Sequence, residues 1–135
     1  MGEPFRHRLR VRWHECDLQG VVFNAHYLAY FDMAITELWR EALGGYQAMV
    51  ARGLDLVVAE TRIRYLKPLR FDEEFDLTVT VQEMGNTAIH TALSAERDGE
   101  TAAEGELRHV FVDTESGEKA PIPDDIREAL EPYST

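Results

Sequence analysis

The sequence predicts an α+β fold in which a five-stranded antiparallel sheet packs against one long helix. Three patterns support this prediction. Apolar residues recur at helical spacing between residues 27 and 43, five other stretches alternate apolar and polar residues, and tight turns between the later stretches favour antiparallel pairing. At 135 residues the chain is long enough for one domain, over residues 1–135, with its own hydrophobic core.

The first strand is expected over residues 7–13, where Val11 and Trp13 belong to an apolar face and arginines form the other face. The stretch Asp17–Gly20 has the Asp-first, Gly-last composition of a type I turn. The chain is therefore expected to turn sharply before the helix begins.

The helix is expected over residues 27–43, because its apolar residues fall on one broad face. Asn24 is a plausible N-cap residue, and Gly44 with Gly45 ends the helix. Since most of the helix surface is apolar, we expect the sheet to cover it.

The remaining chain is expected to be mainly strand. Four predicted strands follow one another as an antiparallel meander, with tight turns at Gly85 and Asp98. Short helices are expected over residues 46–53 and 124–130. The four strands are predicted over residues 55–66, 74–83, 87–97 and 100–113.

Composition excludes several classes of partner. The net charge of −11 argues against nucleic acid or an acidic membrane, which require a broad basic surface. No apolar run reaches the ~18 residues of a membrane-spanning helix.

The single cysteine, Cys16, cannot form an internal disulfide, and no secretion signal is visible, so the expected location is the cytoplasm. The histidines are scattered without metal-ligand spacing, so we expect neither a metal nor a cofactor.

Three segments together resemble one known family, the hotdog-fold acyl-CoA thioesterases of the 4-hydroxybenzoyl-CoA thioesterase type. A turn bearing an Asp leads into a Tyr-rich helix, a Tyr-Leu-Lys-Pro junction follows the second strand, and a Pro-Ile-Pro step precedes the last helix. The matching residues are Asp17, Gly20, Val21, Val22, Asn24, Tyr27, Leu28, Tyr30, Phe31 and Ala34, then residues 65–73 and 121–123.

The resemblance implies a hotdog fold, in which a curved antiparallel sheet wraps around one long central helix. It also implies homodimers whose sheets join edge to edge, often paired again into tetramers, with active sites at the dimer interface. The implied reaction is hydrolysis of an acyl-CoA thioester to the free acid and CoA, so CoA is part of the substrate and not a cofactor.

Asp17 is the expected catalytic residue. An alkyl thiol has a pKa of about 8.5, so the thiolate leaves readily and one ionised carboxylate is enough. Asp17 can attack the thioester carbonyl as a nucleophile or take a proton from water as a general base. Backbone N–H groups at the helix start, over residues 22–25, would polarise the carbonyl. The structural alternative is an Asp that only stabilises its own turn.

Asn24 is the second expected catalytic residue, whose amide would orient water or the thioester; its alternative is a plain helix cap.

Tyr27 is expected in the core or at the pocket wall. Cys16 is expected to be a buried, inert thiol, and His26 to be solvated. Thr61 is expected to lie near the substrate, and an ordinary strand threonine with no role in binding is an equal alternative. The residues expected to contact substrate here are Gly20, Val22, Phe23, Tyr27 and Thr61.

CoA carries phosphates, so cations are expected at the pocket mouth. Arg62, Arg64 and Lys67 are the expected binding residues, and a solvated, paired surface is their alternative. A second arginine row, in the first strand, is expected to pair across strands with acids such as Glu104 and Glu106.

Two other functions remain open at this point. A non-catalytic hotdog module could bind acyl-CoA and serve a partner protein, since fold does not determine function. An enoyl thioester hydratase or dehydratase would need a carboxylate and a histidine acting together, and no histidine has an obvious partner in the sequence.

Overall fold

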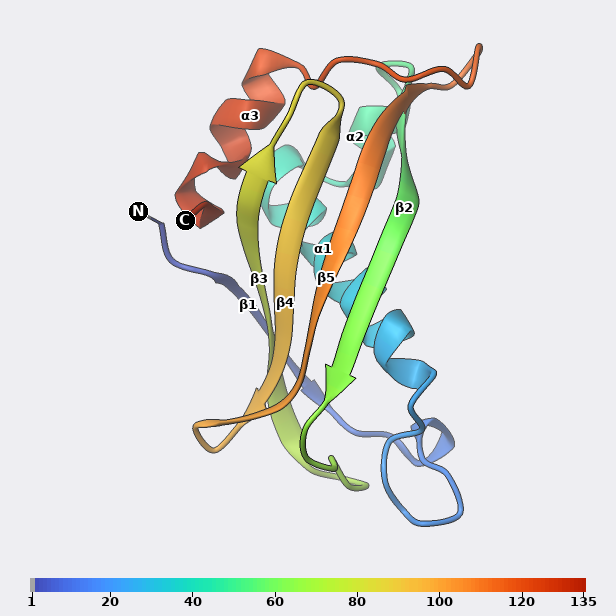
Figure 1. Cartoon of the computed structure of the whole chain (residues 1–135), viewed down its shortest axis with the longest axis vertical. Coiled ribbons are helices and arrows are strands. Elements are labelled where there is room, and N and C mark those ends of the chain that lie inside the picture. Colours follow the sequence, from blue (N-terminus) through green and yellow to red (C-terminus); the bar gives the residue numbers. More distant parts are fainter. Residues whose placement is uncertain (1) are drawn as a thin grey trace.

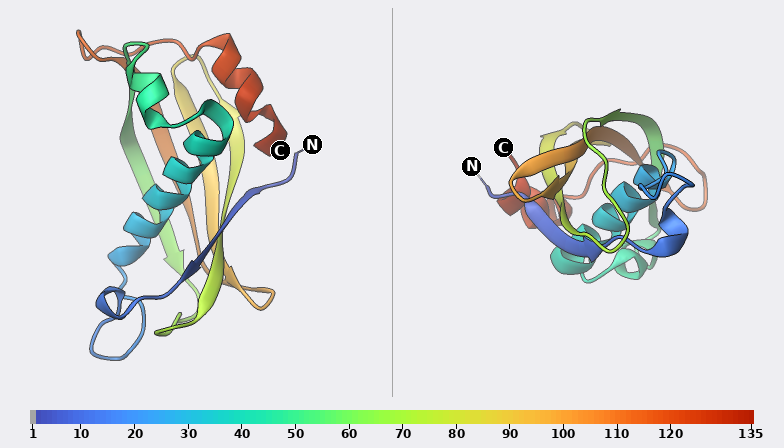
Figure 2. Two further views of the ribbon diagram at one scale, coloured as in Figure 1. Left: turned by 180° about the vertical axis from the view of Figure 1, so that it is seen from behind. Right: turned by 90° about the horizontal axis from the view of Figure 1, so that it is seen from below.

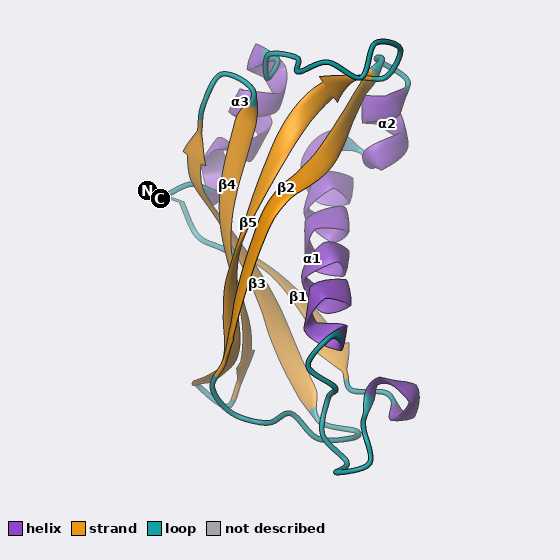
Figure 3. Cartoon of the chain, turned by 45° about the vertical axis from the view of Figure 1, so that its right-hand side comes forward, coloured by secondary structure: helices purple, strands orange, loops and turns teal. Residues whose placement is uncertain are grey.

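The computed structural model describes residues 2–135. Helix α1 (His26–Leu43) lies along one face of a five-stranded sheet (Figure 1, Figure 3). No helix within residues 2–135 is long and apolar enough to cross a membrane. The strands are β1 (Phe5–Arg10), β2 (Leu54–Tyr65), β3 (Glu74–Met84), β4 (Ala88–Arg97) and β5 (Glu100–Asp113), and the short helices are η1 (Trp13–Glu15), α2 (Tyr46–Val50), α3 (Asp124–Leu130) and η2 (Glu131–Tyr133).

The strand order in the sheet is β1-β3-β4-β5-β2, and every neighbouring pair is antiparallel. β3, β4 and β5 form a meander, but the predicted four-strand meander is wrong, because β2 pairs with β5 and not with β3. β1 already occupies the place beside β3. Residues 66–73 therefore carry the chain from the end of β2 to the opposite half of the sheet.

Seen along the long axis of the molecule, the sheet curves around α1 (Figure 2). This α+β arrangement fits the hotdog fold that the resemblance implies. α1 has 18 residues, so the helix expected to be long is of moderate length, about five turns. Its bounds and those of the strands β2 to β5 differ from the predicted ranges by at most one residue.

β1 ends at Arg10, earlier than predicted. Val11 is buried as expected, and its N–H still donates to the Glu73 carbonyl at 2.9 Å. The chain then turns into η1, which leaves Trp13 70% exposed, so its predicted place on the buried face is wrong. The Trp13 ring instead packs edge-on against Phe71, with 5.3 Å between the ring centroids.

α1 packs closely on the sheet at Gly105 of β5. A Cβ at this position would lie 2.8 Å from Cε2 of Phe31 and 2.6 Å from the Arg62 carbonyl oxygen. Phe31 is fully buried and the carbonyl belongs to the neighbouring strand, so neither can move aside. The absence of a side chain at Gly105 therefore sets how near α1 lies to β5.

The outer face of the sheet, away from α1, is polar and rich in ion pairs. The β1 arginines pair with carboxylates of β3 and β4, so their predicted partners Glu104 and Glu106 are wrong. Those two acids lie on β5, on the far side of the sheet from β1, where they pair with Arg64 and Arg62. The β1 pairs are Arg6 with Glu96 at 3.2 Å, Arg8 with Asp76 at 3.0 Å and Arg10 with Glu74 at 2.9 Å.

Candidate active site

The loop between η1 and α1 folds back on itself as a small antiparallel ladder. Cys16 pairs with Val22, and the Asp17 N–H donates to the Val21 carbonyl at 2.9 Å. At the tip, the Gly20 N–H donates to the Asp17 carbonyl at 3.0 Å, which confirms the predicted turn. Gly20 has a φ of 76°, a conformation that glycine adopts without strain.

The Asp17 carboxylate has one engaged oxygen and one free oxygen. Oδ1 accepts the Gln19 N–H at 2.8 Å, so Asp17 does stabilise its own turn. Within residues 2–135, Oδ2 meets neither a hydrogen-bond donor nor a cation. Asp17 is half-buried and lines a cavity, so this oxygen is available for chemistry.

The start of α1 differs from the prediction. α1 begins at His26, Ala25 occupies the N-cap position, and no side chain caps the helix, so the predicted cap at Asn24 is wrong. The carbonyls of Phe23 and Asn24 instead accept the N–H groups of His26 and Tyr27, at 2.9 and 3.3 Å. The Asn24 side chain is therefore not needed by the helix, and it lines the cavity.

Two backbone donors at the start of α1 have no acceptor. Within the described residues, neither the Asn24 N–H nor the Ala25 N–H donates a hydrogen bond, whereas the Val22 and Phe23 N–H groups are bonded to backbone carbonyls. Both free groups lie where the partial positive charge of the helix dipole is greatest. Of the four backbone N–H groups expected to polarise the thioester carbonyl, over residues 22–25, only those of Asn24 and Ala25 are therefore free, in the described part of the chain, to do so.

A cavity of about 400 Å³ lies between this loop, the first turn of α1 and the end of β2. Five predicted site residues line it. Its wall also includes residues that the site prediction missed, although most of them belong to the motif that follows β2. The predicted residues are Asp17, Val22, Asn24, Tyr27 and Lys67, and the missed ones are Val21, Tyr65, Leu66 and Pro68.

Tyr65 links the end of β2 to the start of α1. Its hydroxyl donates to the Asn24 carbonyl at 3.1 Å, and its ring packs against Tyr27 with centroids 5.5 Å apart. Tyr27 is 3% exposed, so it belongs to the core and to the cavity wall at once. Burial, and then the neighbouring Tyr65, raise the pKa of Tyr27 to about 12, so its hydroxyl stays protonated at neutral pH.

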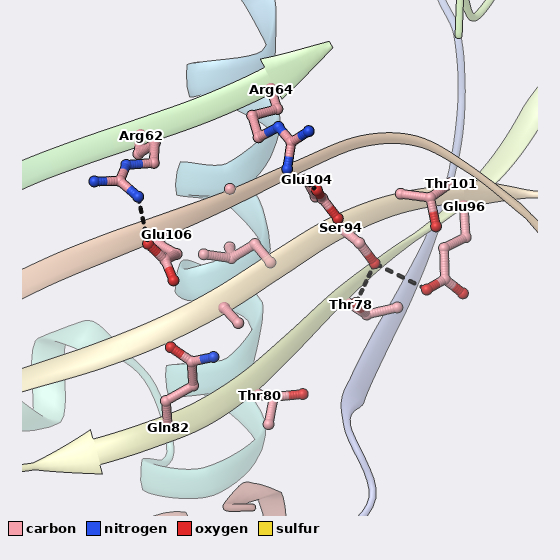
Figure 4. Close-up of a pocket in the computed structure, with 13 residues that line it drawn as sticks. Arg62, Arg64, Thr78, Thr80, Gln82, Ser94, Glu96, Thr101, Glu104 and Glu106 are labelled. Carbon is pink, nitrogen blue, oxygen red and sulfur yellow. Dashed lines mark hydrogen bonds and ion pairs between the residues drawn. The ribbon is translucent and has the colours of Figure 1, made fainter. Parts of the chain in front are cut away.

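The predicted cations are divided between two places. Arg62 and Arg64 line a separate hollow of about 450 Å³ on the outer face of the sheet (Figure 4). There they pair with Glu106 at 3.8 Å and Glu104 at 3.2 Å. Thr61 is exposed, and the alternation of the strand places it on the opposite face of β2 from Arg62.

Lys67 is the predicted cation that lines the Asp17 cavity, and its ammonium pairs with the exposed carboxylate of Glu100. Two other predicted contact residues do not line this cavity. Gly20 forms the tip of the loop, and Phe23 lies beside the helix start with half of its side chain exposed.

Sequence reasoning missed a buried carboxylate two positions before Asp17. Glu15 is 3% exposed, and its Oε1 accepts the Tyr30 hydroxyl at 2.7 Å. His26 was expected to be solvated, but it is partly covered, with Nε2 lying 3.5 Å from Glu15 Oε2. Glutamate is rarely buried, so no sequence pattern pointed to this cluster.

The thiol of Cys16 lies on the same loop. The residue is half-buried, not fully buried as expected. Burial, and then the charges of Glu15 and Asp17, raise the pKa of Cys16, which favours the thiol over the nucleophilic thiolate. Within residues 2–135, no three His, Cys, Asp or Glu side chains are arranged to hold a metal ion.

Comparison with known proteins identifies one family and several relatives. Residues 11–130 match the sequence profile of the thioesterase-like superfamily. The chain is 28% identical over 127 residues to a putative esterase of Aquifex aeolicus, covering 94% of this chain and 98% of that protein. It is 28% identical over 123 residues to the acyl-CoA thioester hydrolase YbgC of Escherichia coli O6:H1, covering 90% and 92% of the two chains. The crystal structure of a hypothetical protein from Thermus thermophilus has a TM-score of 0.86 and 32% identity, covering 95% of this chain and 98% of that one.

Proposed function

The chain belongs to the thioesterase-like superfamily, and we propose that it hydrolyses acyl-CoA thioesters to the free acid and CoA at the Asp17 cavity. One observation supports this site above all. Asp17, with a free carboxylate oxygen, and Asn24, with a free backbone N–H, line the same cavity, and the free Ala25 N–H follows directly. A nucleophile or base and the donors for an oxyanion are thus combined in one place.

In the proposed reaction, the thioester carbonyl oxygen accepts hydrogen bonds from the Asn24 and Ala25 N–H groups. By one route, Asp17 Oδ2 bonds to the carbonyl carbon, the carbon–sulfur bond breaks to release CoA thiolate, and water hydrolyses the resulting anhydride. By the other, Asp17 takes a proton from water as that water attacks the same carbon, and the carbon–sulfur bond then breaks to release CoA thiolate and the free acid. In both routes the N–H groups stabilise the negative charge that develops on the carbonyl oxygen. In enzymes where one such donor is a side chain and was deleted, the transition state lost about 2.7–4 kcal/mol of stabilisation.

The rest of the cavity suits an acyl-CoA. Tyr65, Leu66 and Pro68 offer an apolar wall for the acyl group, and the Asn24 amide can orient the thioester or the attacking water. Lys67 would meet the anionic part of CoA once its ion pair opens. Arg62, Arg64 and Thr61 stay candidates for substrate contact, although each arginine must first exchange its glutamate partner.

The test is thiol release from a panel of acyl-CoA chain lengths by the wild type and Asp17→Asn. Asparagine keeps an oxygen that can accept the Gln19 N–H, so the melting temperature should stay unchanged while hydrolysis is lost. Asp76→Asn is a matched change on the outer face, where Asp76 pairs with Arg8, and it should retain full activity. An active Asp17→Asn enzyme would refute the proposed site.

One observation favours the alternative function of an enoyl thioester hydratase. Glu15 and His26 form the carboxylate–histidine pair that this chemistry needs. Neither residue lines the Asp17 cavity, so hydrolysis is the better-supported function. The same assay separates the alternatives. A hydratase adds water to an enoyl-CoA without releasing thiol, and a binding module retains acyl-CoA without changing it.

We also propose that the chain forms homodimers through β2. This strand has 12 residues and lies at the edge of the sheet, with Val57 and Val58 46% and 51% exposed. A long, uncovered edge strand with apolar side chains favours pairing with another strand. Sedimentation velocity should show a dimer for the wild type and a monomer for a Val57→Glu, Val58→Glu double variant. A wild-type monomer at all concentrations would contradict this pairing.

A further inference from the structure

Glu15 is the one buried carboxylate within residues 2–135. Removing a carboxylate from water is costly unless hydrogen bonds and charges compensate it. The burial of Glu15 therefore raises the question of what its carboxylate holds.

The carboxylate of Glu15 connects the end of the β1 segment to α1. Oε1 accepts the Tyr30 hydroxyl at 2.7 Å and the Arg12 N–H at 2.8 Å. Oε2 lies 3.4 Å from Arg12 Nε, 3.5 Å from His26 Nε2 and 3.9 Å from His14 Nε2. Tyr30 is fully buried, so its hydroxyl has a fixed position in the core.

This environment keeps Glu15 ionised. Burial raises the pKa of its carboxyl, but the hydrogen bonds from the Arg12 N–H and the Tyr30 hydroxyl, with the charges of Arg12 and His26, outweigh burial and hold the pKa below its ordinary value. The hydrogen bond from Tyr30 is thus charge-assisted, which makes it stronger than a bond between neutral groups.

The backbone of Glu15 closes the loop that carries Asp17. The Glu15 carbonyl accepts the Phe23 N–H at 3.0 Å, which is the base of the ladder that Cys16 and Val22 continue. Phe23 directly precedes Asn24, whose N–H is free. Glu15 is therefore bonded on one side to the residue next to the donors and on the other side to the interior of α1.

We propose that Glu15 is a positioning residue for the reaction proposed above: its buried carboxylate, held by Tyr30, fixes the Asp17 loop against the free N–H groups at the start of α1. The inference rests on the proposed function, since it concerns the distance between Asp17 and those donors. Glu15 does not line the cavity, so it acts through the loop and not on the substrate.

The test uses the full chain with Glu15→Gln, Tyr30→Phe and the double variant. Glutamine can still accept from Tyr30 and Arg12, and phenylalanine removes only the hydroxyl, so each variant should fold. A displaced reacting group costs up to about 100-fold in rate. We expect each single variant to lower kcat by about tenfold or more with KM within about twofold, because glutamine offers Tyr30 a neutral acceptor in place of a charged one and phenylalanine offers Glu15 no hydroxyl. The double variant should lose no more than the worse single one, because both changes act on the same hydrogen bond.

Two matched controls separate this link from a general loss of a glutamate charge or a tyrosine hydroxyl. Glu74→Gln changes an exposed carboxylate that pairs with Arg10, and Tyr133→Phe removes a hydroxyl that donates to Glu41. Both should keep wild-type kcat. Amide hydrogen exchange of residues 16–25 should accelerate in Glu15→Gln and Tyr30→Phe but not in the controls.

Wild-type kcat in Glu15→Gln and Tyr30→Phe would overturn the proposal, as would losses that multiply in the double variant or appear only in KM. Failure of the proposed function gives a different result. In that case wild-type protein releases no thiol, or Asp17→Asn remains active, whatever the exchange of residues 16–25 shows.

Discussion

The outer face of the sheet and the segment from Arg12 to α1 both contain paired charged side chains, but the two regions use them in opposite ways. On the outer face each β1 arginine meets a carboxylate within 3.2 Å, yet every one of these arginine side chains is more than half exposed. At the end of η1, directly before the loop, the carboxylate of Glu15 is 3% exposed and accepts hydrogen bonds from two sides.

The difference shows why the number of ion pairs says little about their importance. Water competes for exposed charges, so each exposed pair adds about 0–1 kcal/mol to stability. The buried carboxylate cannot exchange its partners for water, and its geometry is therefore fixed. The charged side chains of the outer face keep the surface of the sheet polar. The carboxylate of Glu15 instead fixes the position of the backbone at Arg12 relative to the Tyr30 side chain of α1.

The strongest test of this contrast is Glu15→Ala compared with Glu74→Ala. Truncating Glu15 leaves the buried Tyr30 hydroxyl and the partly buried Arg12 N–H without an acceptor, and we expect a loss of about 3 kcal/mol in the free energy of unfolding. Truncating Glu74 leaves the exposed Arg10 guanidinium free to be solvated by water, so the free energy of unfolding should fall by less than about 1 kcal/mol. Urea denaturation of both variants measures the difference, and equal losses would remove the distinction between the two regions.

A second test compares cations, one from each region. Lys67 lines the Asp17 cavity, whereas Arg64 lies in the outer hollow beside Glu104. Lys67→Glu should raise KM for acyl-CoA by about tenfold, the effect of losing one charge-assisted contact. The sequence predicts a rise for Arg64→Glu as well, and its outer position makes the expected rise smaller. Steady-state kinetics at low ionic strength decides, and a larger effect at Arg64 would place the CoA phosphates on the outer face.

The smallest expected effect concerns a buried ionisable group that lacks the partners of Glu15. His109 of β5 is 4% exposed, and its Nδ1 has no hydrogen-bond partner within residues 2–135. Burial lowers the pKa of His109, and the charge of Asp32 offsets this only in part. The unfolded chain, with a pKa near 6.5, then binds more protons just below that pH, so stability should fall as the pH drops through this value.

His109→Leu should remove this dependence. Melting temperatures of the wild type and of His109→Leu, measured between about pH 5.5 and pH 7.5, should diverge toward the acidic end. Parallel curves would mean that His109 titrates as freely in the folded chain as in the unfolded one.

Local patterns predicted the elements of this fold well and their arrangement less well. Alternation identifies β2 as a strand, but the same alternation suits a place beside β3 or beside β5. Which neighbour β2 takes depends on β1, which comes from the N-terminal end of the sequence and fills the place beside β3. The pattern of one strand contains no information about that competition.

The candidate site divides in the same way. Asp17 and Lys67 belong to motifs that are continuous in sequence, and the structure brings them to one cavity. Glu15 was missed because its burial depends on the Tyr30 hydroxyl, which reaches it from inside α1. The predicted cap at Asn24 failed because backbone carbonyls in the preceding turn accept the first helical N–H groups, a local geometry that residue preferences do not describe.

The bond from the Gln19 N–H to Asp17 Oδ1 has a stereochemical consequence. It makes the two oxygens of a symmetric carboxylate inequivalent, since Oδ1 already accepts a hydrogen bond whereas both lone pairs of Oδ2 are free within residues 2–135. In the reaction proposed above, the donors at the helix start hold the thioester carbonyl oxygen, so attack by Oδ2 comes from one side of the carbonyl. A turn whose first role is in folding would thus select a single prochiral face of a flat, achiral group.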